Sequence, residues 1–317
     1  MFGKGNAPDE VATPVRGKRN PKRDAVHFKQ SIFANKLLAD KLYITTEYET
    51  FYNSSSGDRK ADYETKLAAH YDAMSTFDSG YFRKSTPLDA MEKYIIGTTE
   101  NKYEFLAQNG PLLTVLLKPD SDDYFHFLNY NHRSRQRKEA FRRIVVGLWS
   151  QENALPLADA MIALFEDRLI SPYLASFKVL LSFNPTKPRP DSEPLKGDKA
   201  VIYYHADLSD LSTDRVGNTI VRAIDGAVPT SRRDARFAPF YEEIAQGIAW
   251  ADETGQASFT QVRDDVISRV VRANQNVKDE EEFYELVLAE LEEDNVNPLA
   301  THRYFALTDT PPAPALT

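Results

Sequence analysis

Apolar residues recur at helical spacing between residues 29 and 75. Between residues 29 and 75 the stretches QSIFANKLLADKLYITTEYETFYN and DRKADYETKLAAHYDAM carry this pattern, and the polar break SSSGD separates them. From residue 90 to 131 the pattern changes to alternation, with turn signals at GTTEN, AQNG and PDSDD. The pattern predicts two helices followed by an antiparallel meander of three or four strands.

The second half of the chain mixes both periods, so it predicts helices and strands in turn. Ser258 is the expected N-cap of the first of two closing helices. The predicted elements are two helices over 133–173, strands at 176–183 and 199–206, a helix over 209–224, a long irregular connection over 226–257, and closing helices over 258–276 and 278–294.

These elements predict an α+β fold with a helical N-terminal part and an antiparallel or mixed central sheet with helices packed against it. Residues 1–27 mix Gly, Pro and charge with little to bury, and they are expected to form a flexible basic tail. Residues 28–306 are predicted as a single α+β domain. Residues 307–317 are Pro-rich and predicted as a second flexible tail.

Composition narrows the class of protein. The 317 residues are 42% hydrophobic, which is ordinary for a soluble globular chain, and the net charge of −8 argues against a general nucleic-acid binder. No cysteine is present, so disulfides, thiolate zinc sites and a cysteine nucleophile are excluded. No apolar run reaches the ~18 residues that span a bilayer, and no signal peptide is evident. We therefore expect a cytoplasmic protein that does not bind a membrane.

Two strand residues are candidates for acid and base chemistry. In DDYFHFLNY, alternation puts Tyr124, His126 and Leu128 on one face of a strand and the two phenylalanines on the other. Such a histidine is as often structural as catalytic. Lys178 lies inside the apolar strand SFKVLLSF, where burial would favour its neutral amine as a general base. A lysine at a strand edge, with its ammonium in water, is an equally good interpretation.

Arginines supply candidate anion sites. Arg263 lies in the first turns of a predicted helix, where backbone N–H groups and the guanidinium could hold a phosphate, although an ion pair with the neighbouring acids competes with this interpretation. Arg133, Arg135 and Arg137 form a local basic cluster, and a solvated helix start is its default interpretation.

Other functional motifs are missing from the sequence. There is no P-loop, GxGxxG, HExxH, GxSxG or kinase catalytic-loop pattern. The six histidines show no pair at helical metal-ligand spacing, so neither a metal nor a cofactor is expected.

Several segments, taken in order, carry a resemblance to a known family. LADKLYITTEYETFYN, DSGYF, FKVLLSF, KAVIYYHADL, GAVP and AQGIAWADETGQASFTQVRDDVISRVV resemble the Hop A family of type III secretion effectors, over most of residues 35–305. That family includes lyases of class V lanthipeptide biosynthesis, which resemble the phosphothreonine lyase effectors in turn. Those lyases remove phosphate from a phosphorylated residue by β-elimination without a metal or cofactor.

The resemblance implies roles for particular residues. FKV matches the strand of the catalytic base and implies that role for Lys178, and YFHF implies that His126 is the acid. Arg263 would grip the phosphate, with Arg133 and Arg135 as further contacts. Tyr124 stands where the lyases have a lysine, and it is the remaining candidate for the phosphate site.

A second alignment stays open. Many Hop A members carry a strand Arg-x-Tyr-x-Asn, and matching its asparagine to Asn129 turns His126 to the opposite face, because a slip of one residue flips every side chain. The first alignment predicts a phosphoserine or phosphothreonine lyase that acts on a peptide or protein, and the second a binding-only effector or scaffold. The expected partner is a phosphorylated peptide or protein. The resemblance also allows a kinase-like partner and translocation into a host cell, and a nucleic-acid partner is disfavoured.

Overall fold

The computed structural model describes residues 30–53, 59–77, 86–116, 122–132, 141–182, 195–196, 198–253, 257–305 and 311–316. The chain divides into two compact units, and the prediction of one domain over 28–306 does not anticipate this division. The first unit comprises the described residues of Met1–Ser75, Pro239–Glu242 and Asp252–Thr308, and the second those of Thr76–Ala238, Glu243–Ala251 and Asp309–Thr317. The basic tail predicted over 1–27 lies outside the described residues.

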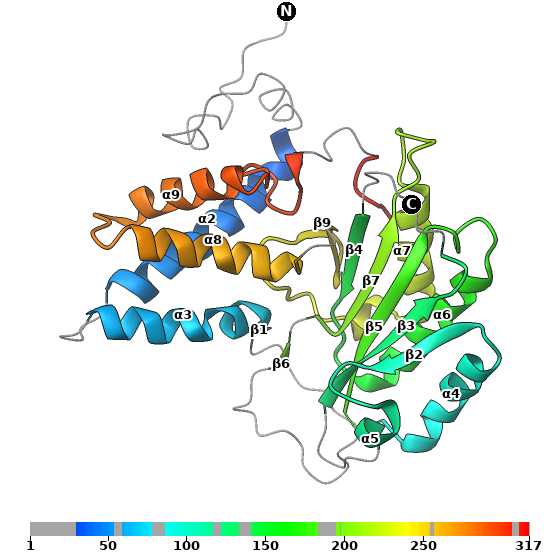
Figure 1. Ribbon diagram of the computed structural model, residues 1–317. Coiled ribbons are helices and arrows are strands. Elements are labelled where there is room, and N and C mark those ends of the chain that lie inside the picture. The colour runs from blue at the N-terminus through cyan, green and yellow to red at the C-terminus, as the bar shows by residue number, and fades with distance from the viewer. Residues whose placement is uncertain are drawn as a thin grey trace, which may run out of the picture. The chain divides into compact units, whose positions relative to one another are not determined.

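The first unit is built from helices (Figure 1). The two helices predicted between residues 29 and 75 are present, and so are the two closing helices. As predicted, the Ser258 side chain caps the first closing helix by accepting a hydrogen bond from the Gln261 N–H. These helices are α2 (Gln30–Tyr52), α3 (Arg59–Ser75), α8 (Phe259–Ala273) and α9 (Glu280–Glu293).

The second unit is organised on a sheet of seven described strands in the order β2-β3-β5-β7-β4-β9-β8. The registers of β2 with β3, β3 with β5, β5 with β7 and β7 with β4 are all antiparallel. The strands are β2 (Tyr103–Ala107), β3 (Asp122–Asn129), β4 (Phe141–Val146), β5 (Leu174–Ser182), β7 (Ala200–His205), β8 (Glu242–Ala245) and β9 (Ile248–Glu253). A separate pair joins β1 (Thr76–Phe77) and β6 (Leu195–Lys196).

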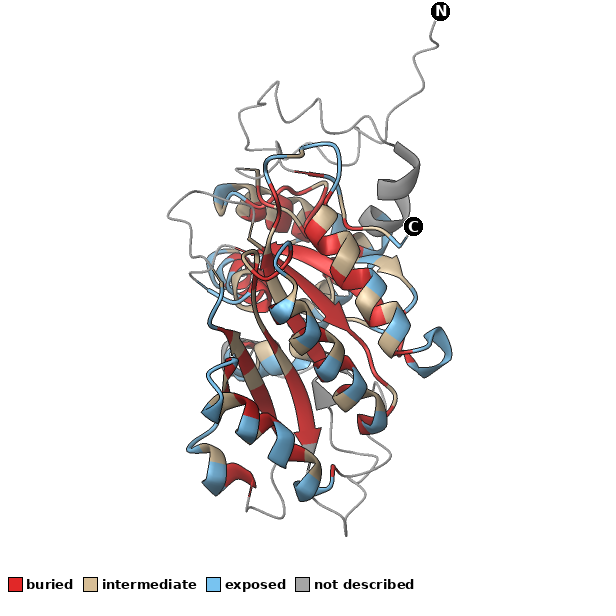
Figure 2. Cartoon of the chain, turned by 90° about the vertical axis from the view of Figure 1, so that its right-hand side faces the viewer, coloured by how far each residue is buried: buried red, intermediate tan, exposed pale blue. Residues whose placement is uncertain are grey.

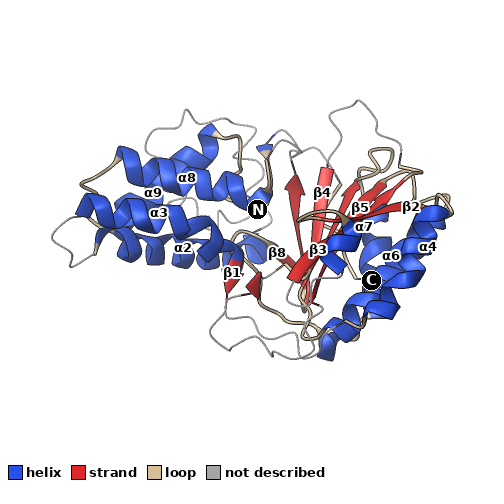
Figure 3. Cartoon of the chain, turned by 60° about the horizontal axis from the view of Figure 1, so that its bottom comes forward, coloured by secondary structure: helices blue, strands red, loops and turns tan. Residues whose placement is uncertain are grey.

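Helices cover one face of this sheet (Figure 3). Figure 2 shows their exposed sides in pale blue and the buried strands in red behind them. The core between the two layers includes Phe127 and Phe177, whose rings stack with centroids 4.4 Å apart. The helices of this unit are α4 (Glu92–Thr99), α5 (Leu112–Leu116), α6 (Ala154–Glu166) and α7 (Arg215–Ala227), with short 3-10 turns at Leu88–Met91, Gln151–Asn153 and Thr230–Arg232.

The α+β fold class is confirmed, but three segments differ from the prediction. Among its described residues, the region 90–131 contains two strands and two helices instead of a meander. Residues 141–146, expected in a helix, form the interior strand β4, where Ile144, Val145 and Val146 are buried. An interior strand is apolar on both faces, so it shows no alternation. The irregular connection predicted over 226–257 contains the hairpin β8–β9, whose two-residue loop ends at Gly247 with φ 71°.

Candidate functional site

Lys178 and His126 lie on one face of the sheet. They are direct register partners across β5 and β3, and partners in an antiparallel pair project to the same side. The residues that flank them along the strands, including Phe127 and Phe177, project to the other side and belong to the hydrophobic core. The alternation predicted for residues 124–129 is therefore present, with His126 on the side away from the core.

The side chain of Asn129, on which the second alignment depends, lies on the opposite face of β3 from His126. Its side chain lies on the core side of β3 and is 7% exposed. The amide Nδ2 donates to the carbonyl oxygens of Ser171 at 2.9 Å and Leu174 at 2.8 Å. Asn129 and His126 thus occupy opposite faces, and it is His126 that shares a face with Lys178.

Tyr124 places an aromatic ring against the lysine. The Lys178 Nζ lies 4.1 Å from the centroid of the Tyr124 ring, which is a cation–π contact. The Tyr124 hydroxyl donates to the Asp198 carbonyl oxygen at 2.6 Å. The sequence suggested that Tyr124 contacts phosphate; in the structure its hydroxyl contacts the backbone of Asp198 and its ring contacts Lys178.

The imidazole of His126 is held in its neutral form. Its Nε2 lies 3.2 Å from the Oε1 of Gln108, which accepts the hydrogen bond. Burial lowers the pKa of His126 to about 4, and the nearby positive charge of Lys178 adds to the effect. Near neutral pH the ligand-free protein therefore carries an uncharged imidazole beside the lysine.

Arg143 is on the same face, and it is not one of the candidate residues that were named from the sequence. It is the register partner of Tyr203 on β7, and Tyr203 pairs with Ser176, two residues from Lys178 on β5. The Arg143 guanidinium carbon lies 5.3 Å from the centroid of the Tyr203 ring, and the residue is 5% exposed. The signal that could have found it is FRRIVV, in which a β-branched run follows the arginines and favours a strand over a helix.

We call this face of the sheet in the second unit the Lys178 face. It combines aromatic rings with cationic or ionisable groups, a composition suited to an anionic group on a peptide. It comprises Tyr124, His126, Lys178, Tyr203 and Arg143.

Arg263 has a different environment from the one predicted. It belongs to the first unit and is fully buried in α8. Its guanidinium donates to the Tyr304 hydroxyl at 2.8 Å and to the carbonyl oxygens of Phe259 and Thr301. These donors are directed at internal acceptors, so the phosphate site predicted at this helix start is not formed by Arg263.

The other arginines predicted to bind phosphate, Arg133 and Arg135, lie outside the described residues, and so does Arg137. Among the described residues, no group of three or more His, Asp or Glu side chains is arranged to hold a metal ion. In the same part of the chain, no helix is long and apolar enough to cross a membrane.

Two solved structures resemble this chain in fold. The effector protein from Pseudomonas syringae pv. tomato strain DC3000 matches with a TM-score of 0.58 at 13% identity, over 86% of this chain and 98% of that chain. The effector protein from Pseudomonas syringae pv. syringae strain 61 matches with a TM-score of 0.55 at 12% identity, over 86% of this chain and 99% of that chain. No protein-family model and no curated protein sequence matches the chain. At such identities the likeness extends to the fold alone.

Proposed function

We propose that the protein is a carbon–oxygen lyase that removes phosphate from phosphothreonine or phosphoserine in a peptide or protein. The observation that supports this most strongly is the direct pairing of Lys178 with His126 across β3 and β5. A base and an acid on neighbouring strands can act on the Cα hydrogen and the leaving oxygen of one substrate residue.

In the proposed reaction, the neutral amine of Lys178 removes the Cα proton. The electron pair left on Cα forms the Cα=Cβ double bond, and the Cβ–O bond breaks with its electrons going to the phosphate. The imidazolium of His126 donates a proton to that oxygen. The products are inorganic phosphate and a dehydrobutyrine or dehydroalanine residue, and the balance needs no metal or cofactor.

The resting protonation state is the reverse of the reactive one. With a His126 pKa of about 4, the resting pair is an ammonium and a neutral imidazole, whereas elimination needs an amine and an imidazolium. Both states contain the same number of protons, so moving one proton from Lys178 to His126 connects them. A phosphate dianion beside His126 favours the imidazolium, and we propose Arg143 as its additional cationic partner.

The biological setting belongs to the same proposal. Because two effector proteins share the fold, we propose that the chain acts as an effector inside a host cell on a phosphorylated protein. The resemblance to lanthipeptide lyases supports the other setting, in which the substrate is a ribosomal peptide phosphorylated by a kinase-like partner.

A binding-only effector is the second candidate function. The observation that favours it is the low pKa of His126, because a neutral imidazole cannot donate the required proton. In that case the Lys178 face would hold a phosphorylated peptide without turnover.

The mass of the product distinguishes these functions. After incubation with a phosphothreonine peptide, elimination predicts free phosphate and a peptide one water lighter than the unphosphorylated form, since the bridging oxygen leaves with the phosphate. A product of unphosphorylated mass would indicate hydrolysis. Saturable binding with no change in mass would support the binding-only function and contradict the lyase.

A further inference from the structure

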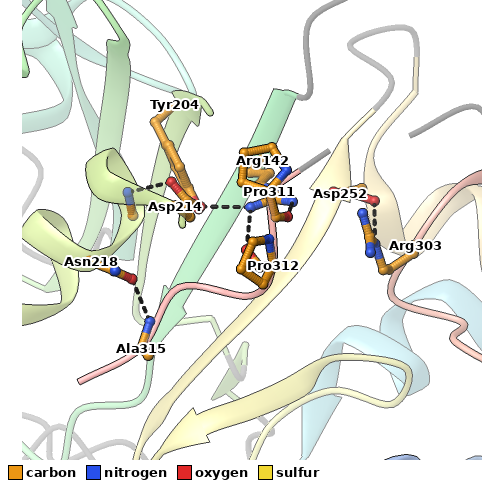
Figure 4. Close-up of polar contacts among 10 residues, drawn as sticks. Arg142, Tyr204, Asp214, Asn218, Asp252, Arg303, Pro311, Pro312 and Ala315 are labelled. Atoms are coloured by element: carbon orange, nitrogen blue, oxygen red, sulfur yellow. Dashed lines mark hydrogen bonds and ion pairs between the residues drawn. The ribbon is translucent and has the colours of Figure 1, made fainter. Parts of the chain in front are cut away.

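The C-terminal segment PPAPAL, residues 311–316, is held against the second unit (Figure 4). Arg142 on β4 donates to the carbonyl oxygens of Pro311 and Pro312. At the other end of the segment, the Ala315 N–H donates to the Asn218 side chain on α7 at 2.7 Å. The prediction of a flexible tail over 307–317 does not anticipate these contacts.

The guanidinium of Arg142, which contacts the segment, is buried in the core of the second unit. Arg142 is fully buried and pairs with the equally buried Asp214 at 2.7 Å. Tyr204 donates its hydroxyl to the same carboxylate at 2.6 Å, and the guanidinium carbon lies 4.6 Å from the centroid of a Trp250 ring. The ion pair fixes the guanidinium, so its remaining donors are oriented before the segment arrives.

The segment matches this site in its backbone chemistry. Proline has no N–H, so Pro311 and Pro312 present only carbonyl acceptors to the arginine. A residue that precedes proline favours an extended backbone, which applies to Pro311 and Ala313 and reduces the entropy lost on binding. Ala313 packs against the hydrophobic core, and Pro311 and Pro314 are buried.

Gly217 provides an independent indication that the segment lies close to α7. A Cβ placed on this glycine would lie 2.7 Å from the Pro314 Cβ, and nearer still to the Asp214 carboxylate and the Tyr204 hydroxyl. A Cβ placed on Gly226 in the same helix would have nothing within 4 Å. The helix therefore has a glycine where the segment and the ion pair approach it.

We propose that Arg142, Asp214, Asn218 and Gly217 form a recognition site for a short, extended, proline-rich peptide, and that the chain's own residues 311–316 occupy it in cis. Arg142 and Arg143 are consecutive in β4 and project to opposite faces, so this peptide site is distinct from the Lys178 face. The inference does not depend on the proposed lyase activity.

The first test separates the segment from the chain. A protease recognition sequence inserted between residues 308 and 309 allows folded full-length protein to be cut and washed, after which labelled PPAPALT is titrated and followed by fluorescence anisotropy. Saturable binding to cut protein, with none to uncut protein, is expected. A peptide with the Ala315→Pro change, which lacks the donor to Asn218, should bind about two- to tenfold more weakly. Equal binding of a reversed-sequence peptide, or no binding to cut protein that remains folded, would overturn the proposal.

The second test keeps the chain intact. Hydrogen exchange at the Ala315 amide should be slow in the full-length protein and faster in Asn218→Ala and Gly217→Ala, while Gly226→Ala serves as the matched control in the same helix and leaves it unchanged. Exchange of Ala315 at the rate of an unstructured peptide would overturn the proposal. Protection that rises with protein concentration would show that a second copy provides the segment, and would overturn the assignment in cis.

Discussion

Lys178 illustrates how neighbouring side chains set the behaviour of one residue. The Tyr124 ring, 4.1 Å from the Nζ atom, stabilises an ammonium, which includes the ammonium that forms as the base takes up a proton. His126 on the paired strand acts in the opposite way when it is charged, because two nearby cations repel each other. The positive charge of Lys178 therefore opposes protonation of His126.

The Lys178→Met variant should change the titration of His126. Because the lysine charge is one of the two causes that hold the pKa of His126 at about 4, its removal should raise that pKa, while burial still keeps it below the ordinary value of about 6.5. The measurement is an NMR titration of the His126 ring. An unchanged pKa in the variant would show that the two groups do not interact.

At the residue scale the sequence predicted the strand face of one candidate residue, His126, but not the burial of another, Arg263. The alternation YFHFLN correctly indicated the side of β3 that carries His126, because period two directly reports the faces of a strand. Arg263 was expected at an accessible helix start. In the structure it shares the buried side of α8 with Phe259, Val266 and Val270, a spacing of four, three and four residues that could have indicated burial.

At the scale of elements, one histidine connects three helices of the first unit. His70 on α3 lies 2.7 Å from the Asp264 carboxylate on α8 and 3.4 Å from the Glu47 carboxylate on α2. Burial alone would lower the pKa of His70, but hydrogen bonds with these two acids outweigh it and raise the pKa to about 9. The imidazolium thus stabilises the packing of the three helices near neutral pH.

The stability of the first unit should therefore depend on pH above neutrality. A histidine with a raised folded-state pKa contributes fully below its unfolded pKa of about 6.5, and the contribution is lost as the pH rises through about 9. In denaturant unfolding, the free energy of unfolding should fall by on the order of 3 kcal/mol as the pH rises from about 6.5 to about 9.

His70→Gln should remove most of this dependence, and His126→Gln should retain it, because His126 is already neutral throughout the range. Equal pH dependence in the wild type and His70→Gln would contradict the role of His70.

The elements were predictable where an apolar pattern was long or was clearly bounded by polar residues. The closing helix α8 shows the long pattern, whereas the strands β5 and β7 were recognised as short apolar runs bounded by polar or Pro-rich segments. β4 was not predictable by periodicity, because an interior strand with both faces buried resembles a buried helix, and the preceding charge run favoured the helix. The Gln-Gly turn of β8–β9 was a local hairpin signal that a composition rich in Pro and Arg obscured.

At the scale of the whole molecule, the net charge of −8 should influence the choice of substrate. An acidic body repels an acidic peptide and attracts a basic one, whereas the phosphate is bound by local cations. Phosphothreonine peptides with flanking Lys or Arg should therefore be processed with a higher kcat/KM than peptides with flanking Asp or Glu. The difference should shrink as salt is added, because salt screens long-range charge. A preference that is independent of salt would indicate direct contacts instead.

The fold of the whole chain was predictable only as a class. Composition and pattern indicate α+β, but they contain no signal for the two compact units or for the strand order, both of which depend on contacts between distant segments. The likeness to the two effector proteins covers 86% of the chain and shows the fold alone, because one fold can carry many different functions.

The central claim, that Lys178 is the base of a phosphate elimination, is tested most directly by one comparison of product masses. Wild type, Lys178→Met and Lys102→Met are incubated with the same phosphothreonine peptide, Lys102 being an exposed lysine of the same unit that forms an ion pair with Glu100. We expect the dehydrated peptide from the wild type and Lys102→Met, and a rate about 10²- to 10⁴-fold lower for a Lys178→Met variant that remains folded. Dehydrated product formed by Lys178→Met at the rate of Lys102→Met would contradict the claim.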